Sequence, residues 1–346
     1  MKETKYLIVG QGLAGTLLSY FFEKEKKDFL IFTSPNKKPS SFVSAGMFNA
    51  IGGKRFLKTW LADELLEFAK TTYKNIEKDL NLNLYHEEEI LNFFQNQDEK
   101  NLSLKKLEEK ENSTYLKLDN HKYNGIKDEN GYISIKNGGW LNVPLLLQSF
   151  EKYFQNKLIY EDINFQELKY KNEKWIYKDY SFDKIIFCEG YHAINNPFFK
   201  EIKFLLCKGQ VISIKDNKKI LDRNKVFKKG IYLVNTEENI YKVGATYEWN
   251  DLTEEITEKG INDLTNKLKN FLDIDYEIIK KEVGIRPTVS DKKPILGEHP
   301  NYKNIYIFNG LGTKGVMLSP YFAKQIFDFI INEKPILKEV DINRFF

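Results

Sequence analysis

A glycine turn near the start of the chain limits its fold more than any other feature. Gly10, Gly12 and Gly15 form a G-x-G-x-x-G pattern between an apolar run at 6–9 and apolar residues at helical spacing over 13–22. The first glycine permits a tight turn, the second lets the backbone approach a pyrophosphate, and the third lets helix and strand pack closely. The pattern predicts a dinucleotide-binding βαβ unit with the phosphates at the helix N-terminus.

The end of the second predicted strand departs from the usual pattern. An acidic residue normally holds the adenosine ribose there, but Thr33 and Ser34 occupy the place, and no Asp or Glu occurs at 29–62. The two hydroxyls could make a weaker ribose contact. Alternatively, Lys37 and Lys38 could bind a 2′-phosphate and favour NADP, although we favour a solvated loop for these lysines.

The rest of the chain alternates between runs of helical and of strand character. An α/β fold is expected, with a second, antiparallel sheet. The predicted helices are Leu57 to Leu82, Val143 to Phe154 and Glu254 to Phe271, and the predicted strands are 29–32, 183–188, 211–214, 231–234, 240–243 and 305–308.

Composition excludes several classes of protein. The chain has 346 residues and a net charge of +4, which does not by itself indicate nucleic-acid binding. Cys188 and Cys207 lack metal-ligand spacing and are expected to be reduced structural thiols of a cytoplasmic protein. None of the four histidines has a metal-ligand partner at useful spacing. No signal peptide and no transmembrane segment are expected.

Four further segments complete a family pattern. Together with the glycine turn, and in this order, they resemble the FAD-dependent oxidoreductase family that includes D-amino acid oxidase, glycine oxidase, sarcosine oxidase and the flavin domain of a bacterial tRNA-modifying enzyme. The segments are Ser44–Met47, Phe187–Tyr191, Gly284–Pro287 followed by Asp291, Pro294 and Gly297, and Gly310–Gly315. Lys208–Gln210 and Gly244–Glu248 also resemble strands of the family's substrate domain.

The resemblance implies FAD as the cofactor and no metal. It places Ser44–Met47 beside the flavin ring and Gly310–Gly315 under its pyrimidine edge. The residues expected to bind FAD are Gly10, Gly12, Leu13, Ala14, Gly15, Thr33, Ser34, Ser44, Ala45, Gly46, Met47, Ile163, Glu189, Gly190, Gly310, Gly312, Thr313, Lys314 and Gly315.

Arg286 is the expected substrate ligand, because the family's arginine in this motif grips the substrate carboxylate. A guanidinium suits that role, since it can bind a carboxylate through two parallel hydrogen bonds. Tyr232 matches a substrate-contacting tyrosine of the glycine oxidase branch, and Tyr247 is expected to line the same pocket. Asn235-Thr236 replaces the Pro-Arg that usually follows the tyrosine, which weakens the case for a D-amino acid or glycine substrate.

One pair of charged residues allows two interpretations. Lys54 and Arg55 follow Gly52-Gly53 and could bind cofactor phosphate or an anionic substrate. A solvated pair is the equally weighted alternative.

The expected architecture is a two-domain α/β flavoprotein. The Rossmann-like FAD domain is discontinuous and comprises residues 1–80, 140–195 and 285–346. The substrate domain, an antiparallel sheet with helices, comprises residues 81–139 and 196–284.

The expected reaction is oxidation of a C–N bond of an amino acid or related amine by hydride transfer to flavin, with oxygen or another acceptor reoxidising it. The alternatives are a tRNA-modifying flavoenzyme acting on a carboxymethylaminomethyl base, a non-catalytic flavin-binding protein and an NADP-dependent reductase. A small-molecule substrate is expected and a nucleic-acid partner is not.

Overall fold

The apolar runs around the glycine turn form neighbouring parallel strands. The computed structural model describes residues 1–36, 38–53 and 55–346. In it β1 (Lys2–Val9) pairs with β2 (Phe29–Thr33), and α1 (Leu13–Lys24) connects them. Leu7, Ile8 and Phe32 are fully buried, as expected of a parallel sheet covered on both faces. The predicted βαβ unit is therefore present.

The described residues divide into two compact units. Unit 1 contains Met1–Phe42, Val143–Cys207 and Ile285–Phe346, and unit 2 contains Val43–Asn142 and Lys208–Gly284. The chain thus passes between the units four times, and each unit is assembled from segments distant in sequence.

Unit 1 contains a mostly parallel sheet whose strands include β11-β2-β1-β14 side by side. The carboxyl half of β14 pairs in parallel with β21, and its amino half pairs with an antiparallel hairpin. The further elements of this unit are α5 (Val143–Tyr153), β11 (Leu158–Tyr160), β12 (Lys169–Lys171), β13 (Lys174–Tyr177), β14 (Tyr180–Phe187), β20 (Ile295–Glu298), β21 (Ile305–Asn309) and α7 (Gly315–Asn332).

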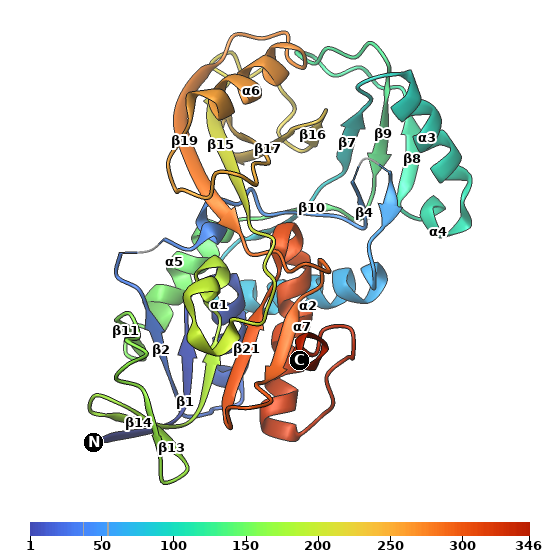
Figure 1. Cartoon of the computed structure of the whole chain (residues 1–346). Coiled ribbons are helices and arrows are strands. Elements are labelled where there is room, and N and C mark those ends of the chain that lie inside the picture. Colours follow the sequence, from blue (N-terminus) through green and yellow to red (C-terminus); the bar gives the residue numbers. More distant parts are fainter. Residues whose placement is uncertain (37, 54) are drawn as a thin grey trace. The chain divides into compact units, whose positions relative to one another are not determined.

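Aromatic side chains pack the helices of unit 1 against its sheet. Phe22 of α1 meets Phe29 of β2 and Phe327 of α7 edge-on, with ring centroids 5.8 and 5.1 Å apart. The other face of the sheet, with Leu7 and Phe187, packs against the short 3₁₀ helix Pro197–Phe199 and the C-terminal segment. Figure 1 shows this layered arrangement around β1, β2, β14 and β21.

Unit 2 is built on a large sheet of order β19-β15-β18-β17-β16-β7-β9-β8, with a small sheet β3-β10-β6. Its elements are β3 (Met47–Phe48), β4 (Ile51–Gly52), β5 (Leu57–Lys58), α2 (Ala62–Leu80), β6 (Tyr85–Glu87), β7 (Ile90–Phe93), α3 (Gln97–Glu108), α4 (Lys110–Ser113), β8 (Leu116–Asp119), β9 (Tyr132–Ile135), β10 (Gly139–Leu141), β15 (Cys207–Lys215), β16 (Val226–Lys228), β17 (Tyr232–Glu237), β18 (Ile240–Gly244), α6 (Glu258–Lys269) and β19 (Glu277–Arg286).

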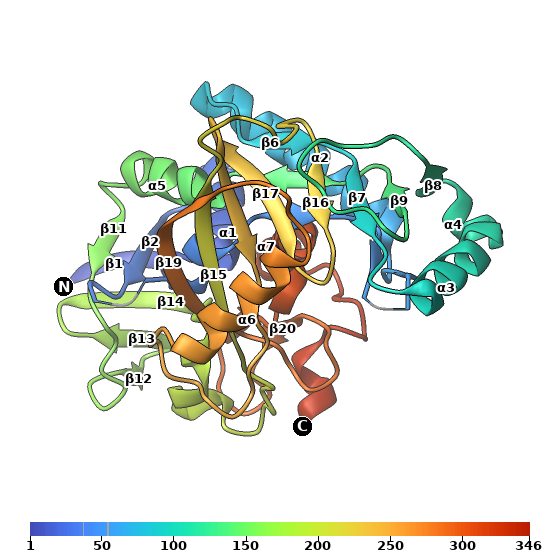
Figure 2. The ribbon, with the colours of Figure 1, turned by 90° about the horizontal axis from the view of Figure 1, so that it is seen from above.

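Alternation along the strands of unit 2 gives its large sheet two different faces. Phe227, Leu233 and Val243 point to one face, where they form an apolar core with Leu264 and Leu268 of α6. Figure 2 shows α6 lying along these strands. Along each strand, the residues that alternate with these core residues therefore occupy the opposite face of the sheet. Tyr232 is one of them.

Two predicted helices begin later than expected. The helix predicted at Leu57 to Leu82 was wrong in its first turn, because residues 57–58 form β5 and α2 begins at Ala62. Leu61 adopts a left-handed conformation (φ 53°), which an α-helix cannot include. The helix predicted from Glu254 begins at Glu258, where Thr257 caps it by accepting a hydrogen bond from the Gly260 amide.

The two units do not follow the predicted domain limits at every point. The sequence analysis assigned residues 43–80 and 140–142 to the cofactor domain and 196–207 to the substrate domain. The first two segments lie in unit 2 and the third lies in unit 1. Pairing of β3 with β10 holds residues 47–48 in unit 2. The function of each unit stays a prediction. None of the described helices is long and apolar enough to cross a membrane.

Candidate active site

The glycine turn between β1 and α1 is closed by backbone contacts. Gly10 has a positive φ of 101°, and a Cβ on Gly15 would lie 1.9 Å from the Gly10 carbonyl oxygen. A Cβ on Gly12, in contrast, would meet nothing closer than Pro39 at 3.5 Å. Gly12 is the N-cap of α1 and provides no side-chain hydrogen bond. The Leu13 amide donates to the Ser41 hydroxyl over 3.3 Å. The positive dipole end of α1 beside this turn fits a dinucleotide pyrophosphate.

A carboxylate stands beside the end of β2 although the sequence of β2 lacks one. β11 pairs with β2 so that Tyr160 lies opposite Thr33. The chain then brings Asp162 to Ser34, whose hydroxyl donates a 3.0 Å hydrogen bond to the Asp162 carboxylate. Ile163, an expected cofactor residue, follows directly and is partly buried. Sequence reasoning missed Asp162, because it lies 128 positions from Ser34 and only the pairing of β11 with β2 brings the two together.

The structure gives no support to a phosphate-binding or substrate-binding role for Lys38 or Arg55. Lys38 and Arg55 are both exposed, which fits the solvated interpretation. Lys37 and Lys54 lie outside the described residues.

The carboxyl ends of β14 and β21 lie beside the glycine turn, because β1, β14 and β21 run parallel. Gly190 has a positive φ of 57°, and its carbonyl accepts a 2.8 Å hydrogen bond from the Asn309 side chain. The Glu189 carboxylate accepts a 2.7 Å hydrogen bond from Asn196. Ligands of open α/β sheets bind at this edge, so Glu189 and Gly190 lie where a cofactor is expected.

The loop 310–315 packs against the residues that follow Arg286. The Gly312 amide donates to the Pro287 carbonyl over 3.2 Å, and Gly312 has a positive φ of 55°. Thr313 is exposed, while burial lowers the pKa of Lys314 below its usual value. Gly315 opens α7, and a Cβ there would lie 3.4 Å from Leu13. The loop therefore brings the start of α7 close to the start of α1.

Arg286 is the last residue of β19, and contacts with Cys207 and Ser40 fix its position. One guanidinium nitrogen lies 3.5 Å from the Cys207 sulfur, to which it donates. The preceding residue, Ile285, exchanges hydrogen bonds with the Ser40 hydroxyl at 2.7 and 3.3 Å. Cys207 was expected to be a purely structural thiol; its contact with Arg286 is a link that the sequence alone did not indicate.

The remaining part of the G-x-R-P motif stabilises the fold. Asp291 forms an ion pair with Arg344, with a nitrogen–oxygen distance of 2.7 Å. Gly297 has a positive φ of 133°, and a Cβ there would lie 2.8 Å from Ile342. Asp291 and Gly297 thus hold the C-terminal segment, which contains Ile342 and Arg344, against the rest of unit 1.

The flavin-side segment predicted at 44–47 belongs to unit 2. Gly46 has a φ of 72°, and a Cβ there would lie 1.9 Å from the Leu141 carbonyl oxygen. Its amide donates to the Ser44 hydroxyl over 2.9 Å, Ala45 is buried, and Met47 pairs with Trp140. Backbone approach this close excludes any side chain at Gly46.

A buried lysine joins this segment to the sheet face that carries Tyr232. Lys242 donates to the Ser44 carbonyl over 3.3 Å and pairs with Glu282 at 3.5 Å. Burial lowers the pKa of Lys242, and Glu282 opposes this shift. Lys242 alternates with the core residues Tyr241 and Val243, so it shares the face of Tyr232. A lysine at that position of a buried strand is a signal that sequence analysis could have used.

Gly244 makes room for the Tyr232 ring. The two residues lie opposite each other on β17 and β18. A Cβ on Gly244 would lie 2.9 Å from the Tyr232 hydroxyl and 2.6 Å from Val211. The ring thus lies over a position without a side chain.

Gly244→Ala is therefore expected to displace Tyr232. Overpacking of this kind costs about 1–3 kcal/mol of unfolding free energy, which a urea titration would measure. Substrate affinity should weaken too, if Tyr232 contacts substrate. Unchanged stability together with unchanged affinity would show that the Tyr232 ring is not confined there.

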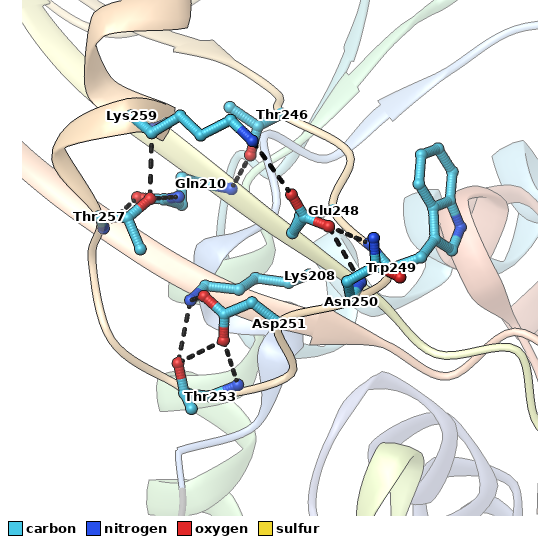
Figure 3. Close-up of polar contacts among 11 residues, drawn as sticks. Lys208, Gln210, Thr246, Glu248, Trp249, Asn250, Asp251, Thr253, Thr257 and Lys259 are labelled. Atoms are coloured by element: carbon cyan, nitrogen blue, oxygen red, sulfur yellow. Dashed lines mark hydrogen bonds and ion pairs between the residues drawn. The ribbon is translucent and has the colours of Figure 1, made fainter.

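Tyr247 lies on a segment that β15 holds in place. Lys208 and Glu248 exchange backbone hydrogen bonds of 2.8 and 3.0 Å, and the Gln210 amide donates to the Thr246 hydroxyl over 2.8 Å. The two motifs Lys208–Gln210 and Gly244–Glu248 are thus direct partners (Figure 3). Tyr247 itself is 55% exposed, so the structure gives it no buried surroundings.

An ion pair between a buried lysine and a partly exposed aspartate fixes the chain after Tyr247. Lys208 is fully buried, and its ammonium contacts Asp251 at 2.5 Å and Thr253 at 3.1 Å. The Lys208 ammonium and Thr253 lower the pKa of Asp251 to about 2. Gln210 also bonds Thr257 at the start of α6 (Figure 3). The described residues contain no cluster of His, Cys, Asp and Glu that could hold a metal.

Comparison with known proteins identifies the family. The family model described as FAD dependent oxidoreductase matches residues 5–328. Glycine oxidase of Geobacillus kaustophilus is 26% identical over 125 residues, which are 36% of this chain and 33% of that protein. The tRNA 5-methylaminomethyl-2-thiouridine biosynthesis bifunctional protein MnmC of Campylobacter fetus is 29% identical over 191 residues, 50% of this chain and 29% of that protein.

The fold agrees with this family. The crystal structure of glycine oxidase from Geobacillus kaustophilus superposes with a TM-score of 0.84 at 16% identity and covers 99% of both chains. In sequence, the chain matches the curated relatives over about a third of their length. The chain therefore belongs to the FAD-dependent oxidoreductase family, and it is an enzyme with FAD as its cofactor.

Proposed function

We propose that this chain oxidises a C–N bond of an amino acid or a related primary or secondary amine. The observation that supports this best is Arg286, a partly buried guanidinium at the end of β19, next to the residues that contact the loop 310–315. Its fork can hold a substrate carboxylate through two hydrogen bonds. A cation fixed in this way orients the carbon next to the carboxylate, which is the carbon to be oxidised.

FAD, when bound, would supply the chemistry by taking up a hydride from that carbon. The resulting imine is hydrolysed by water, and oxygen or another acceptor takes up the electrons. The protein's own task is to position the substrate and exclude competing reactions. We assign Arg286 to the carboxylate, and Tyr232 and Tyr247 to further substrate contacts.

The residues of unit 1 fit FAD. Backbone oxygens exclude a side chain at Gly10 and at Gly15, and Gly12 leaves open space at the N-terminus of α1, where a pyrophosphate needs backbone amides. Lys314 and the exposed Thr313 lie on the loop assigned to the flavin. The assignment of the remaining FAD contacts, including Ser44–Met47 in unit 2, rests on the family resemblance.

Asp162 is proposed to take the ribose role that β2 lacks. Asp162→Asn keeps the shape and removes the charge, so FAD affinity should fall about tenfold, as expected for loss of a hydrogen bond to a charged group. Equilibrium dialysis of the apoprotein with FAD would measure this. Asp183→Asn, at an exposed aspartate of β14, is the control and should bind FAD as wild type does. Equal affinity in all three proteins would refute the role.

A tRNA-modifying activity is the second candidate. It is supported by the 29% identity to a tRNA-modifying bifunctional protein over half of this chain. A carboxymethylaminomethyl base also presents a C–N bond beside a carboxylate, so Arg286 could serve it equally. Filter binding of tRNA at two salt concentrations distinguishes the candidates, because a tRNA enzyme should bind in a salt-dependent way.

A further inference from the structure

Two aromatic side chains of unit 2 lie exposed against each other. Tyr247 is 55% exposed and Trp249 is 61% exposed, and their rings stack with centroids 6.1 Å apart and planes 27° from parallel. Among the exposed aromatic residues of the described chain, these two alone stack on each other. Trp140 and Trp175, in contrast, are buried, as large aromatic residues are on average. An exposed aromatic surface of this kind is typical of a binding site.

Anchors on both sides of the two rings hold their loop in one conformation. Before the rings, the Thr246 amide donates to the Gln210 carbonyl over 3.1 Å. After them, Asp251 pairs with the buried Lys208, and the Thr253 amide donates to the Asp251 carboxylate over 2.9 Å. A surface that is fixed in advance loses less conformational entropy when a ligand binds. The two rings are thus presented in a fixed position, as a binding surface requires.

The carboxylate between the two rings in sequence is occupied by contacts within the protein. Glu248 accepts hydrogen bonds of 2.9 Å from the Trp249 and Asn250 amides and lies 4.0 Å from the Lys259 ammonium. Figure 3 shows the Trp249 side chain pointing away from these contacts. The surface that the rings offer is therefore apolar and aromatic, and it suits another aromatic ring or an extended apolar chain.

The two rings follow closely on the strand position opposite Tyr232. Gly244, the last residue of β18, pairs with Tyr232, and a Cβ there would lie 2.9 Å from the Tyr232 hydroxyl. Tyr247 comes three residues later, so the Cα atoms of Gly244 and Tyr247 are at most about 11 Å apart. A ligand beside the Tyr232 hydroxyl is therefore close enough to reach the rings with a side group, and both positions belong to unit 2.

We propose that Tyr247 and Trp249 form an aromatic subsite, which binds an aromatic or extended apolar group of the substrate. The preferred substrates are then amino acids or N-substituted amino acids that carry such a group. This inference rests on the proposed function in one respect, namely that Tyr232 and Tyr247 face the substrate. It requires no contact between that group and any residue of unit 1.

Substrates that differ only in one side group test the aromatic subsite. N-methylglycine is compared with glycines that carry a benzyl, 2-phenylethyl or 3-phenylpropyl group on nitrogen, because this series varies the reach of the phenyl ring. At least one phenyl-bearing substrate should exceed N-methylglycine about tenfold in kcat/KM, as expected for burial of a phenyl ring. Trp249→Ala should abolish this preference, and Trp249→Phe, which keeps a ring, should retain most of it.

Leu252→Ala provides the matched control. Leu252 is 40% exposed on the same loop but is not one of the two stacked rings. Leu252→Ala should keep the preference for the phenyl-bearing substrate. If Leu252→Ala and Trp249→Ala lose that preference equally, the effect belongs to the loop as a whole and the proposal is wrong.

Collisional quenching by iodide gives a readout that is independent of turnover. Trp140 and Trp175 are buried and Trp60 is partly buried, so Trp249 should provide most of the emission that iodide can reach. Phenylacetate, 3-phenylpropionate and 4-phenylbutyrate lack an amine and therefore have no C–N bond to oxidise. At least one of these acids should protect Trp249 of the oxidised holoenzyme from iodide, whereas acetate should not. Trp249→Phe should lose both the accessible emission and the protection.

The outcomes separate the aromatic subsite from the proposed oxidation. If a phenyl-bearing acid protects Trp249 while no amine reduces the flavin, the subsite stands and the proposed oxidation fails. If amines reduce the flavin but no phenyl-bearing acid protects Trp249, and Trp249→Ala keeps the wild-type order of substrates, the oxidation stands and the subsite is wrong. Protection by tRNA alone would show that the rings stack on nucleobases, which would also overturn the proposal.

Discussion

Gly12→Asp is expected to give a folded protein without FAD. The substitution puts a carboxylate at the N-terminus of α1, where the pyrophosphate is assigned, so both charge and volume oppose cofactor binding. We expect FAD affinity to fall by about 100-fold or more, which corresponds to about 2.8 kcal/mol. The purified variant should be colourless, whereas wild type should be yellow.

Two alanine variants separate loss of FAD from loss of the fold. Gly12→Ala adds a Cβ that meets nothing closer than 3.5 Å, so it should fold and bind FAD far better than Gly12→Asp. Gly15→Ala would force a Cβ to within 1.9 Å of the Gly10 carbonyl oxygen, so it should lower stability itself. A Gly12→Asp protein that keeps its FAD would refute the assignment of the cofactor to this turn.

Arg286→Leu should lower kcat/KM for the best amino-acid substrate by about 30-fold or more. Truncating one partner of a buried charge pair costs about 2–5 kcal/mol, and each 1.4 kcal/mol is a factor of about ten. The FAD spectrum should survive, because the guanidinium is assigned to substrate. Arg286→Lys should recover only part of the loss, since an ammonium cannot reproduce the fork.

The comparison that matters for Arg286 is between an amino acid and its decarboxylated amine. Wild type should strongly prefer the acid, and Arg286→Leu should lose that preference. Cys207→Ala, which removes the sulfur 3.5 Å from the guanidinium, should keep the preference because Arg286 remains. Equal use of acid and amine by wild type would mean that the substrate carries no carboxylate that Arg286 recognises.

Local sequence patterns predicted the βαβ unit and most of the strands, because buried parallel strands and amphipathic helices leave distinct periodicities. The ordered motifs predicted the family. Asp162 was not predictable, because its place beside Ser34 depends on a strand pairing between distant segments. The start of α2 was not predictable either, because the left-handed conformation of Leu61 has no signature in a leucine.

The sequence alone did not indicate the roles of single residues within a motif either. Asp291 belongs to the motif of Arg286, yet it pairs with Arg344 near the C-terminus. Lys242 occurs in a short apolar strand, where the sequence did not indicate its contacts with Glu282 and the Ser44 carbonyl. Such contacts arise from packing between elements, which local periodicity does not encode.

Anaerobic titration of the purified holoenzyme with amino acids and amines tests the central claim most directly. The absorbance of oxidised flavin should bleach with at least one amino acid or N-substituted amino acid, and much less with the amine that lacks its carboxylate. Subsequent admission of oxygen or an artificial acceptor should restore the absorbance. An FAD that stays oxidised with every carboxylate-bearing amine, while dithionite still reduces it, would contradict the proposed oxidation.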